Sequence, residues 1–389
     1  MLRVIARLNL GGPAHQARIL TERLDRERFE TLLVHGRVGS GEEEINWPGP
    51  ETRASVVRLP GLGAAIRPLS DLRALIGLVR LVRRFRPQIV HTHTAKAGLL
   101  GRVAALVVRP RPVVLHTYHG HVLTGYFTGP VTAFYRIAER LLARVSDRLV
   151  GVSEATVDEL VSLRIAPASK FSVVRLGLDL EGFAGSTVDR CAARLQLGLQ
   201  EEDVVCLFVG RLVPVKRVDR LVEAIGLARR ELPQLRLIVA GDGSERATLE
   251  AQVEATGLSE VVSFLGYRRE LSNCMAAADI AVLSSDSEGT PVALIEGGAA
   301  GLPGVATAVG GVAEVLTPEV GELVPAGSVE QFAAALVRLA RDPDLRREKG
   351  EAARARMLAR FGSQRLVEDI SRLYEQLLAN DDRPVSSDG

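Results

Sequence analysis

VVCLFVGRLVPVKRVDRLVEAIGLARR, residues 204–230, changes its hydrophobic spacing within a few residues. The first six residues, Val204–Val209, are apolar and mostly β-branched or aromatic, which is typical of a buried strand. After the turn at Gly210, apolar residues between Arg217 and Arg230 recur three or four positions apart and predict a helix with one buried face. A strand followed at once by a helix is the unit that builds parallel sheets.

The same alternation of short apolar strands and longer amphipathic helices runs through the whole chain, which predicts an α/β protein. One such helix is Leu69–Phe85, where Leu72, Ile76, Val82 and other apolar residues recur at helical spacing and predict its buried face. The pattern pauses near Leu176–Ser186, where three glycines follow a strand, and then starts again. Further strands are predicted at Val4–Leu8, Thr31–Val34, Val56–Leu59, Ile89–His91, Val113–Thr117, Leu149–Val152, Phe171–Val174, Arg236–Ala240, Val261–Leu265 and Ile280–Leu283.

The 389 residues exceed the ~150 that one domain prefers, so two Rossmann-like doubly wound domains are expected. The first domain is predicted at 1–178 and the second at 198–362, with a linker at 179–197. A C-terminal helix at 363–379 is expected to pack back toward the first domain, and 380–389 is expected to be a flexible tail.

The charge is distributed unevenly, although the net charge is only +2. Residues 1–180 carry 26 Lys and Arg against 15 Asp and Glu, whereas residues 181–389 carry 23 against 32. A basic half suits anionic phosphates or an anionic membrane surface. Three arginines, Arg136, Arg140 and Arg144, recur four residues apart beside Phe134, Ile137, Leu141 and Val145. This spacing predicts either a helix lying on a membrane surface or a core-packed helix whose arginines face water.

The three cysteines, Cys191, Cys206 and Cys274, favour neither a disulfide framework nor a zinc site, because their number is odd and no C-x-x-C spacing occurs. We expect them to be buried in a reducing compartment. The chain starts with the strand pattern LRVIARLNL rather than a secretory leader, so we expect a cytoplasmic protein. Val113–Tyr135 has no charged residue, but its glycines and histidines argue against a transmembrane helix.

Two segments in the first half of the sequence follow predicted strands and carry candidate binding or catalytic residues. Gly11-Gly12-Pro13 precedes a helix predicted from Ala14, and free backbone N–H groups at such a turn can hold an anion. A purely structural turn is an equally good reading of these glycines. His119 lies in a loop after the strand Val113–Thr117, where an imidazole can exchange protons or bind a polar substrate. A packing role is the alternative for this histidine.

The second half offers a stronger constellation. Arg211 and Lys216 follow the strand Val204–Val209 and precede a helix, which suits a diphosphate. In SSDSEGTPVALIEGG, residues 284–298, Thr290 is the predicted N-cap of a helix, so the N–H groups of Gly289 and Thr290 would cradle a phosphate. Glu288 and Glu296 flank this cradle and can accept hydrogen bonds from sugar and ribose hydroxyls.

Two further motifs are set aside. Asp342-Pro343-Asp344 matches the D-x-D of metal–nucleotide sites, but it lies between two helical stretches and predicts a helix cap. Gly241-Asp242-Gly243 lacks the third glycine of a dinucleotide fingerprint, because Arg246 stands there. Neither a metal site nor an NAD site is predicted.

Four stretches together resemble the retaining glycosyltransferases of family 4: GRLVPVKRVDRLVEAI, EGTPVALIE, AGLPGVATAVGGVAEV and GGPAHQ. The segments HTHTAKAGLLGR and TYHGH look like the branch that builds bacterial surface polysaccharides. The resemblance implies the GT-B fold, in which two Rossmann-like domains face each other across a cleft. It also implies that the second domain binds a nucleotide-diphosphate sugar, that the first binds the acceptor, and that no metal or other cofactor is needed.

The resemblance assigns a role to each candidate. Arg211 and Lys216 would neutralise the donor diphosphate, Glu288 would hold donor-sugar hydroxyls and Glu296 would hold the ribose. His119 would contact the transferred sugar, so His119 and Glu288 are the expected catalytic residues. Gly12, Gly289 and Thr290 would approach the phosphates. Gly297, Gly298 and Gly304 depart from the family pattern, which commonly has Ala-Met after the second glutamate and Val at the third position.

The expected activity is transfer of a hexosyl group, with a UDP-sugar favoured as donor, to a saccharide or lipid-linked acceptor in cell-surface polysaccharide synthesis. The expected partners include an anionic membrane surface, at the inner face of the membrane, but no nucleic acid. Two alternatives remain at this point: a nucleotide-sugar epimerase of the same fold, and a non-catalytic two-lobed sugar-binding protein.

Overall fold

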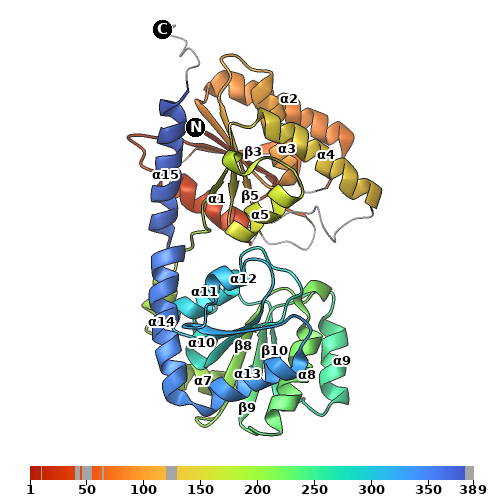
Figure 1. The fold of residues 1–389 in the computed structure, drawn as a ribbon, viewed down its shortest axis with the longest axis vertical. Helices are drawn as coiled ribbons and strands as arrows, with labels where there is room; N and C mark the ends of the chain where they lie inside the picture. Colours follow the sequence, from red (N-terminus) through yellow and green to blue (C-terminus); the bar gives the residue numbers. More distant parts are fainter. Residues whose placement is uncertain (10, 40–43, 46–54, 64, 120–128, 382–389) are drawn as a thin grey trace. The chain divides into compact units, whose positions relative to one another are not determined.

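The computed structural model of the chain describes residues 1–9, 11–39, 44–45, 55–63, 65–119 and 129–381. It divides into two compact units (Figure 1). The first unit is Met1–Leu178 with Ser363–Gly389, and the second is Asp179–Gly362. Of the predicted tail, residues 382–389 lie outside the described part of the chain.

The segment 179–197 is not a linker between the units, in contrast to the prediction. It contains α6 (Glu181–Ala184) and α7 (Arg190–Gln196) and belongs to the second unit. Two arginines fix α7 there, because Arg190 and Arg194 bind the two carboxylate oxygens of Asp279 at 2.7 and 3.2 Å. Cys191 is exposed on this helix, contrary to expectation, whereas Cys206 and Cys274 are buried.

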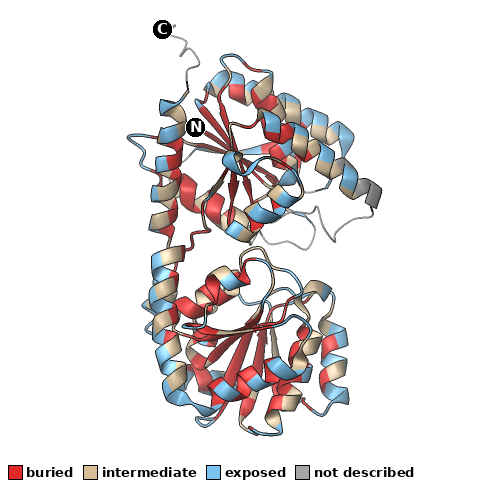
Figure 2. Ribbon diagram, in the orientation of Figure 1, coloured by how far each residue is buried: buried red, intermediate tan, exposed pale blue. Residues whose placement is uncertain are grey.

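The first unit is built on a parallel sheet with the described strand order β3-β2-β1-β4-β5-β6-β7. One face packs on α2 (Pro68–Phe85) and α3 (Ala95–Leu106), and the other packs on α1 (Gly12–Arg23) and α15 (Ser363–Ala379). Alternate residues of the central strands therefore point to opposite cores, and β1, β4 and β5 are buried along their whole length, whereas the edge strand β3 is partly exposed (Figure 2). The strands are β1 (Leu2–Ile5), β2 (Leu32–Arg37), β3 (Ser55–Gly63), β4 (Ile89–His93), β5 (Val113–Tyr118), β6 (Arg148–Gly151) and β7 (Phe171–Val173).

The C-terminal helix α15 is part of the first unit because a buried polar contact joins it to the sheet. Tyr374 of α15 is fully buried, and its hydroxyl lies 3.2 Å from Nη2 of Arg3 and 2.6 Å from Nδ1 of His91. Arg3 also donates to Thr21 Oγ1 at 2.7 Å, which lets a charged side chain lie inside the core.

The second unit has a parallel sheet of the same kind, with the described order β10-β9-β8-β11-β12-β13. Both sheets thus extend outward in two directions from the first strand of the unit, which is the doubly wound arrangement. This confirms the predicted fold class. The strands are β8 (Val204–Val209), β9 (Leu235–Ala240), β10 (Val262–Gly266), β11 (Ile280–Leu283), β12 (Gly304–Thr307) and β13 (Gly321–Val324), and the helices are α8 (Val218–Arg229), α9 (Arg246–Ala255), α10 (Ser272–Ala277), α11 (Val292–Ala299), α12 (Val312–Val315), α13 (Val329–Arg341) and α14 (Pro343–Phe361).

The predicted helix cap at Asp342 is confirmed, because its Oδ1 accepts a hydrogen bond from Leu345 N at 2.9 Å at the start of α14. The predicted buried face of α2 is partly wrong. The buried residues of α2 are Ala74, Leu78 and Val82, whereas Leu72 and Ile76 are exposed. No helix among the described residues is long and apolar enough to cross a membrane.

Candidate functional site

The loops that follow β8 and β11 meet at the carboxyl edge of the second sheet. These two strands are neighbours, and the strand order reverses between them, which is where open α/β sheets bind ligands. Asp286 N donates to Val215 O at 2.8 Å, and Ser284 Oγ donates to Lys216 O at 2.9 Å. These bonds bring together residues that lie about 70 positions apart in sequence.

The centre of this edge is an ion pair between two predicted site residues. Lys216 Nζ lies 2.5 Å from Oε1 of Glu288, and the same oxygen accepts a hydrogen bond from Ser285 Oγ at 2.6 Å. The two charged side chains are only 20% and 10% exposed. A phosphate bound at this edge would compete with Glu288 for the ammonium group of Lys216.

Arg211 is the exposed cation of the loop after β8. Its guanidinium has no hydrogen bond or ion pair with any described residue. The neighbouring arginines differ, because Arg217 binds Asp219 at 2.6 Å and Asp286 at 3.3 Å, and Arg220 binds Asp286 at 2.5 Å. Their charges are already compensated within the unit, whereas the charge of Arg211 remains available to an anionic ligand.

Three glycines let the loops at this edge approach closely. A Cβ at Gly241 would collide with the carbonyl oxygen of Gly210, and one at Gly243 would collide with that of Leu212. Gly310, at φ +49°, packs in the same way against the carbonyl of Glu288. Gly241 and Gly243, after β9, therefore have a packing function beside Arg211. This function was not predicted from the sequence, where the two glycines were tested only as a dinucleotide-binding motif. Their place directly after a strand is the sequence signal for this function.

The start of α11 differs from the prediction. The helix begins at Val292 with Pro291 as its N-cap, so Thr290 is not the capping residue. The reason is that Pro291 is not helical, with φ −78° and ψ 85°, and the chain becomes helical only after it. Thr290 Oγ1 is buried without a partner among the described residues, and Gly289 is half-buried. An unsatisfied buried hydroxyl beside a helix start is able to bind an entering anion.

Glu296 lies on α11, and no described residue bonds to its carboxyl. Burial of the carboxyl raises its pKa from 4.5 to about 7. A half-buried carboxyl without a counter-ion is unfavourable for folding and is therefore typical of a functional position rather than of a solvated helix surface.

His119 follows β5 in the first unit and is held by a second histidine that the sequence did not single out. Nε2 of His119 and Nδ1 of the fully buried His93 are 3.0 Å apart, so one imidazole donates to the other. Burial lowers the pKa of His119 to about 3, so the ring is neutral near neutral pH. The lowered pKa favours the second predicted ability of His119, hydrogen bonding to a polar substrate, over proton exchange near neutral pH. His93 ends β4, and that strand-end position was its signal.

Gly12 is the first residue of α1, which begins two positions before the predicted start. Gly11 is the N-cap and provides no side-chain hydrogen bond, so the first N–H groups of α1 depend on other partners. This geometry fits the predicted anion-binding turn without excluding a purely structural one.

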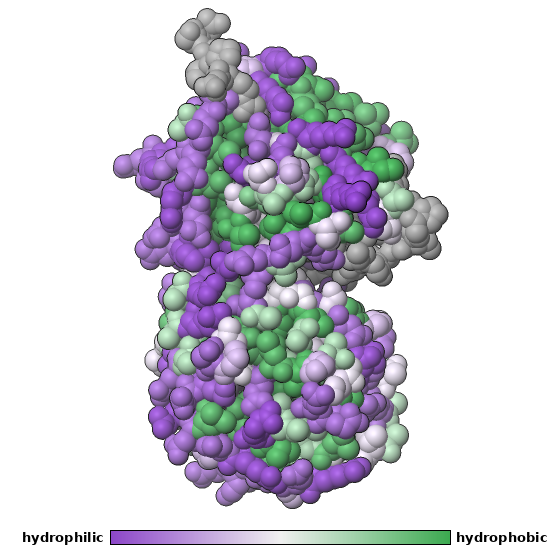
Figure 3. All heavy atoms as spheres, in the orientation of Figure 1, coloured by the Kyte–Doolittle hydropathy of each residue, from purple (hydrophilic) through white to green (hydrophobic). Residues whose placement is uncertain are grey.

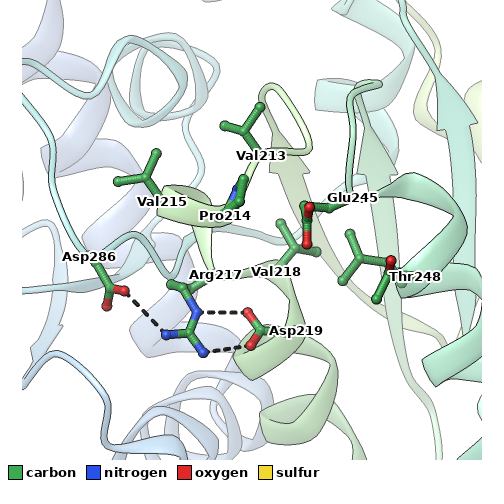
Figure 4. Close-up of a pocket in the computed structure, with 10 residues that line it drawn as sticks. Val213, Pro214, Val215, Arg217, Val218, Asp219, Glu245, Thr248 and Asp286 are labelled. Carbon is green, nitrogen blue, oxygen red and sulfur yellow. Dashed lines mark hydrogen bonds and ion pairs between the residues drawn. The ribbon is translucent and has the colours of Figure 1, made fainter. Parts of the chain in front are cut away.

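A pocket of about 500 Å³ opens beside the loop after β8 (Figure 4). It is lined by Val213, Pro214, Val215, Arg217, Val218, Asp219, Glu245, Thr248, Leu249 and Asp286. None of the predicted site residues is among them. Figure 4 shows Arg217 turned toward Asp219 and Asp286, so these three charged groups of the pocket bind one another.

Two family descriptions cover most of the chain. Residues 10–181 match Glycosyltransferase Family 4, and residues 189–356 match glycosyl transferases group 1. The limits of these matches agree closely with the two structural units.

Curated relatives and solved structures lead to the same group. The chain is 28% identical to an Escherichia coli UDP-Gal:alpha-D-GlcNAc-diphosphoundecaprenol alpha-1,3-galactosyltransferase, over 92% of each chain. It is 31% identical to a D-inositol 3-phosphate glycosyltransferase of Thermobispora bispora, over 80% of this chain and 76% of the relative. The fold is similar to that of Anabaena HepE, solved with UDP-glucose, with a TM-score of 0.77, 20% identity and coverage of 96% of this chain and 99% of the other. With relatives this similar over most of its length, the chain belongs to the family 4 glycosyltransferases and has their GT-B fold.

Proposed function

We propose that this glycosyltransferase moves a hexosyl group, with retention of configuration, from a nucleotide-diphosphate sugar to a saccharide or lipid-linked acceptor in cell-surface polysaccharide synthesis. The observation that carries the proposal is the Lys216–Glu288 pair with the uncompensated Arg211 at the switch point of the second sheet. UDP is the favoured nucleotide. The names of the E. coli galactosyltransferase and of the HepE complex with UDP-glucose support this choice.

Each residue has a role in this proposal. Arg211 and Lys216 compensate the diphosphate charge, Glu288 holds hydroxyls of the donor sugar, and Glu296 holds the ribose. Neutral His119, of the first unit, donates or accepts one hydrogen bond at the transferred sugar. Gly12, Gly289 and Thr290 offer backbone or hydroxyl donors to the phosphates.

The proposed reaction needs no metal ion, because cationic side chains take over the charge of the leaving diphosphate. The bond from the anomeric carbon to the diphosphate oxygen breaks, and the acceptor oxygen bonds to the same face of the sugar. The acceptor proton passes to the departing phosphate oxygen. This accounts for a site without a second catalytic carboxylate. Localisation of the enzyme in the cytoplasm, at the inner face of the membrane, suits a nucleotide-sugar donor and a lipid-linked acceptor.

A panel of nucleotide sugars tests the proposal. We expect one UDP-sugar to raise the melting temperature of the protein and to be consumed with release of UDP when acceptor is present. The anomeric configuration of the product, read by NMR, should match that of the donor. Inversion, or dependence of turnover on an added divalent cation, would contradict the corresponding part of the proposal.

A further inference from the structure

The outer face of α2 carries apolar side chains that the core does not use. Leu69, Leu72 and Ile76 are 79%, 55% and 42% exposed, while the buried face of the helix is formed by other residues. Large aliphatic side chains at neighbouring positions of one exposed helix face are unusual in a protein that contacts only water.

The exposed apolar side chains continue onto the two neighbouring helices. α2 packs on α3, and α3 packs on α4 (Gly129–Val145), so the three form one layer of the first unit (Figure 1). Eight of the twelve large hydrophobic side chains exposed among the described residues lie in these helices or directly beside their ends. They are Ile66, Leu69, Leu72, Ile76, Leu99, Val107, Ile137 and Leu141, and we call them the apolar patch. Figure 3 shows hydrophobic residues at the surface of this unit.

Four arginines extend the outer face of α2 toward its C-terminal end: Arg73, Arg80, Arg83 and Arg84, all exposed. At 100° per residue they lie within the same arc of about 120° as the apolar side chains of α2. None of the four is paired with a carboxylate of the described residues. Asp71, the one acidic residue in the sequence of α2, is bound to Lys96 of α3.

α4 is the helix for which both a membrane-lying and a core-packed arrangement were open, and the structure takes Arg140 out of its row of three arginines. Arg140 donates through its guanidinium to Leu163 O at 2.9 Å and to Arg164 O at 3.0 Å, at the end of α5 (Glu154–Ser162). What α4 adds to the surface is Ile137 and Leu141, whereas the side chain of Phe134 lies outside the described residues.

We propose that the apolar patch and the four α2 arginines form a docking surface for an anionic lipid bilayer. Two other occupants fit less well. A second copy joined symmetrically through this face would place the arginines against one another, at an electrostatic cost. A nucleic acid would use the arginines but has no hydrocarbon phase for exposed leucine and isoleucine side chains. A bilayer with anionic headgroups accepts both.

The inference deepens the proposed function, because a lipid-linked acceptor lies in a membrane. It is tested with the full chain and with sedimenting vesicles of either phosphatidylcholine alone or phosphatidylcholine with 30% phosphatidylglycerol. We expect pelleting with the anionic vesicles only, decreasing as salt is added. Each near-surface cation strengthens such binding roughly fivefold, so Arg73, Arg80, Arg83 and Arg84→Gln together should weaken it by roughly a hundredfold or more.

A second variant, with Leu69, Leu72 and Ile76 replaced by serine, separates apolar from electrostatic binding and should also reduce pelleting. The matched charge control replaces four exposed arginines of the second unit, Arg230, Arg338, Arg341 and Arg347, by glutamine, and the matched apolar control is Leu195→Ser with Leu358→Ser. Both controls should pellet like the wild type.

Several outcomes overturn the inference. The first is that both α2 variants pellet with anionic vesicles as well as the wild type does. The second is that the wild type pellets equally with neutral vesicles. The third is that the protein binds no vesicles and forms a dimer in solution that the α2 variants dissociate. UDP affinity serves as the independent readout of the donor site, which lies in the other unit. An unchanged UDP affinity without vesicle binding would refute only the docking surface, and vesicle binding without UDP binding would refute only the proposed function.

Discussion

Replacing Glu296 by glutamine should stabilise the second unit at alkaline pH and at the same time weaken donor binding. Burial raises the pKa of this carboxyl from 4.5 to about 7, and no described residue compensates its charge. The pKa of this carboxyl is higher in the folded than in the unfolded chain, so its protonation favours folding. This contribution to the free energy of folding is complete below pH 4.5 and is lost as the pH rises through 7. The Glu296 carboxyl therefore costs about 3 kcal/mol of folding free energy at pH 8, where it is ionised in both states. At pH 5 it costs about 1 kcal/mol, because the folded chain keeps the carboxyl protonated while the unfolded chain ionises it.

Glutamine has the same shape and no charge to bury, so Glu296→Gln should recover these amounts. For a unit of this size each kcal/mol corresponds to roughly 2–4 °C, so the melting temperature should rise by roughly 6–12 °C at pH 8 and by much less at pH 5. The assay is thermal unfolding of variant and wild type at both pH values. Glu254→Gln, the same change at an exposed position of α9, is the control and should show no pH-dependent gain.

Donor binding gives the second half of the test. If Glu296 holds the ribose, the neutral amide should lower donor affinity by about 1–2 kcal/mol, or roughly five- to thirtyfold, measured by calorimetry with UDP. A variant that is less stable than the wild type at pH 8, or equally stabilised at pH 5 and pH 8, would refute the electrostatic reasoning. A stabilised variant with unchanged UDP affinity would refute the proposed binding of ribose by Glu296 but not the electrostatic reasoning.

Other substitutions test the remaining parts of the site and the fold. Arg211→Ala and Lys216→Ala should each weaken UDP binding by about 2 kcal/mol or more, with Arg211→Lys restoring only part, and calorimetry that finds both alanine variants unchanged would exclude them from the donor site. His119→Ala should abolish most transfer in a product assay while leaving UDP affinity nearly intact, since the proposed nucleotide site lies in the other unit; poor UDP binding with normal turnover at saturation would reverse this assignment. Tyr374→Phe should lower the free energy of unfolding by about 1–3 kcal/mol, because the hydroxyl satisfies two buried groups, and denaturant titration with no loss of stability would show that these bonds contribute nothing.

Much of the fold could be predicted because its signals are local. The limits of β8 and β11 match the predicted strands, since a short β-branched run between turn residues has few other stable conformations. β12 and β13 were not predicted. Each has four residues beginning with glycine, which is a weak strand former, and they become strands only by pairing with their neighbours.

The misassigned face of α2 shows the limit of hydrophobic periodicity. Leu72 and Leu78 are equally apolar, and spacing alone gives a broad apolar arc without saying which part of it faces the sheet. The packing of α2 on β3 and α3 decided that Ala74, Leu78 and Val82 are buried and left Leu69 and Leu72 exposed.

For the candidate site, residue types and strand-end positions predicted Arg211, Lys216, Glu288 and His119, because parallel sheets gather the ends of their strands at one edge. Glu296 was predicted from its sequence surroundings instead, as an acid within an apolar helix. The sequence alone thus determined two doubly wound domains and the residues that follow their strands. Only the tertiary structure decided the state of those residues. It paired Lys216 with Glu288, left Arg211 without a counter-ion among the described residues, and shifted the pKa values of Glu296 and His119. Charge state depends on distance and on exclusion of water, and both are properties of the folded chain rather than of neighbouring positions in the sequence.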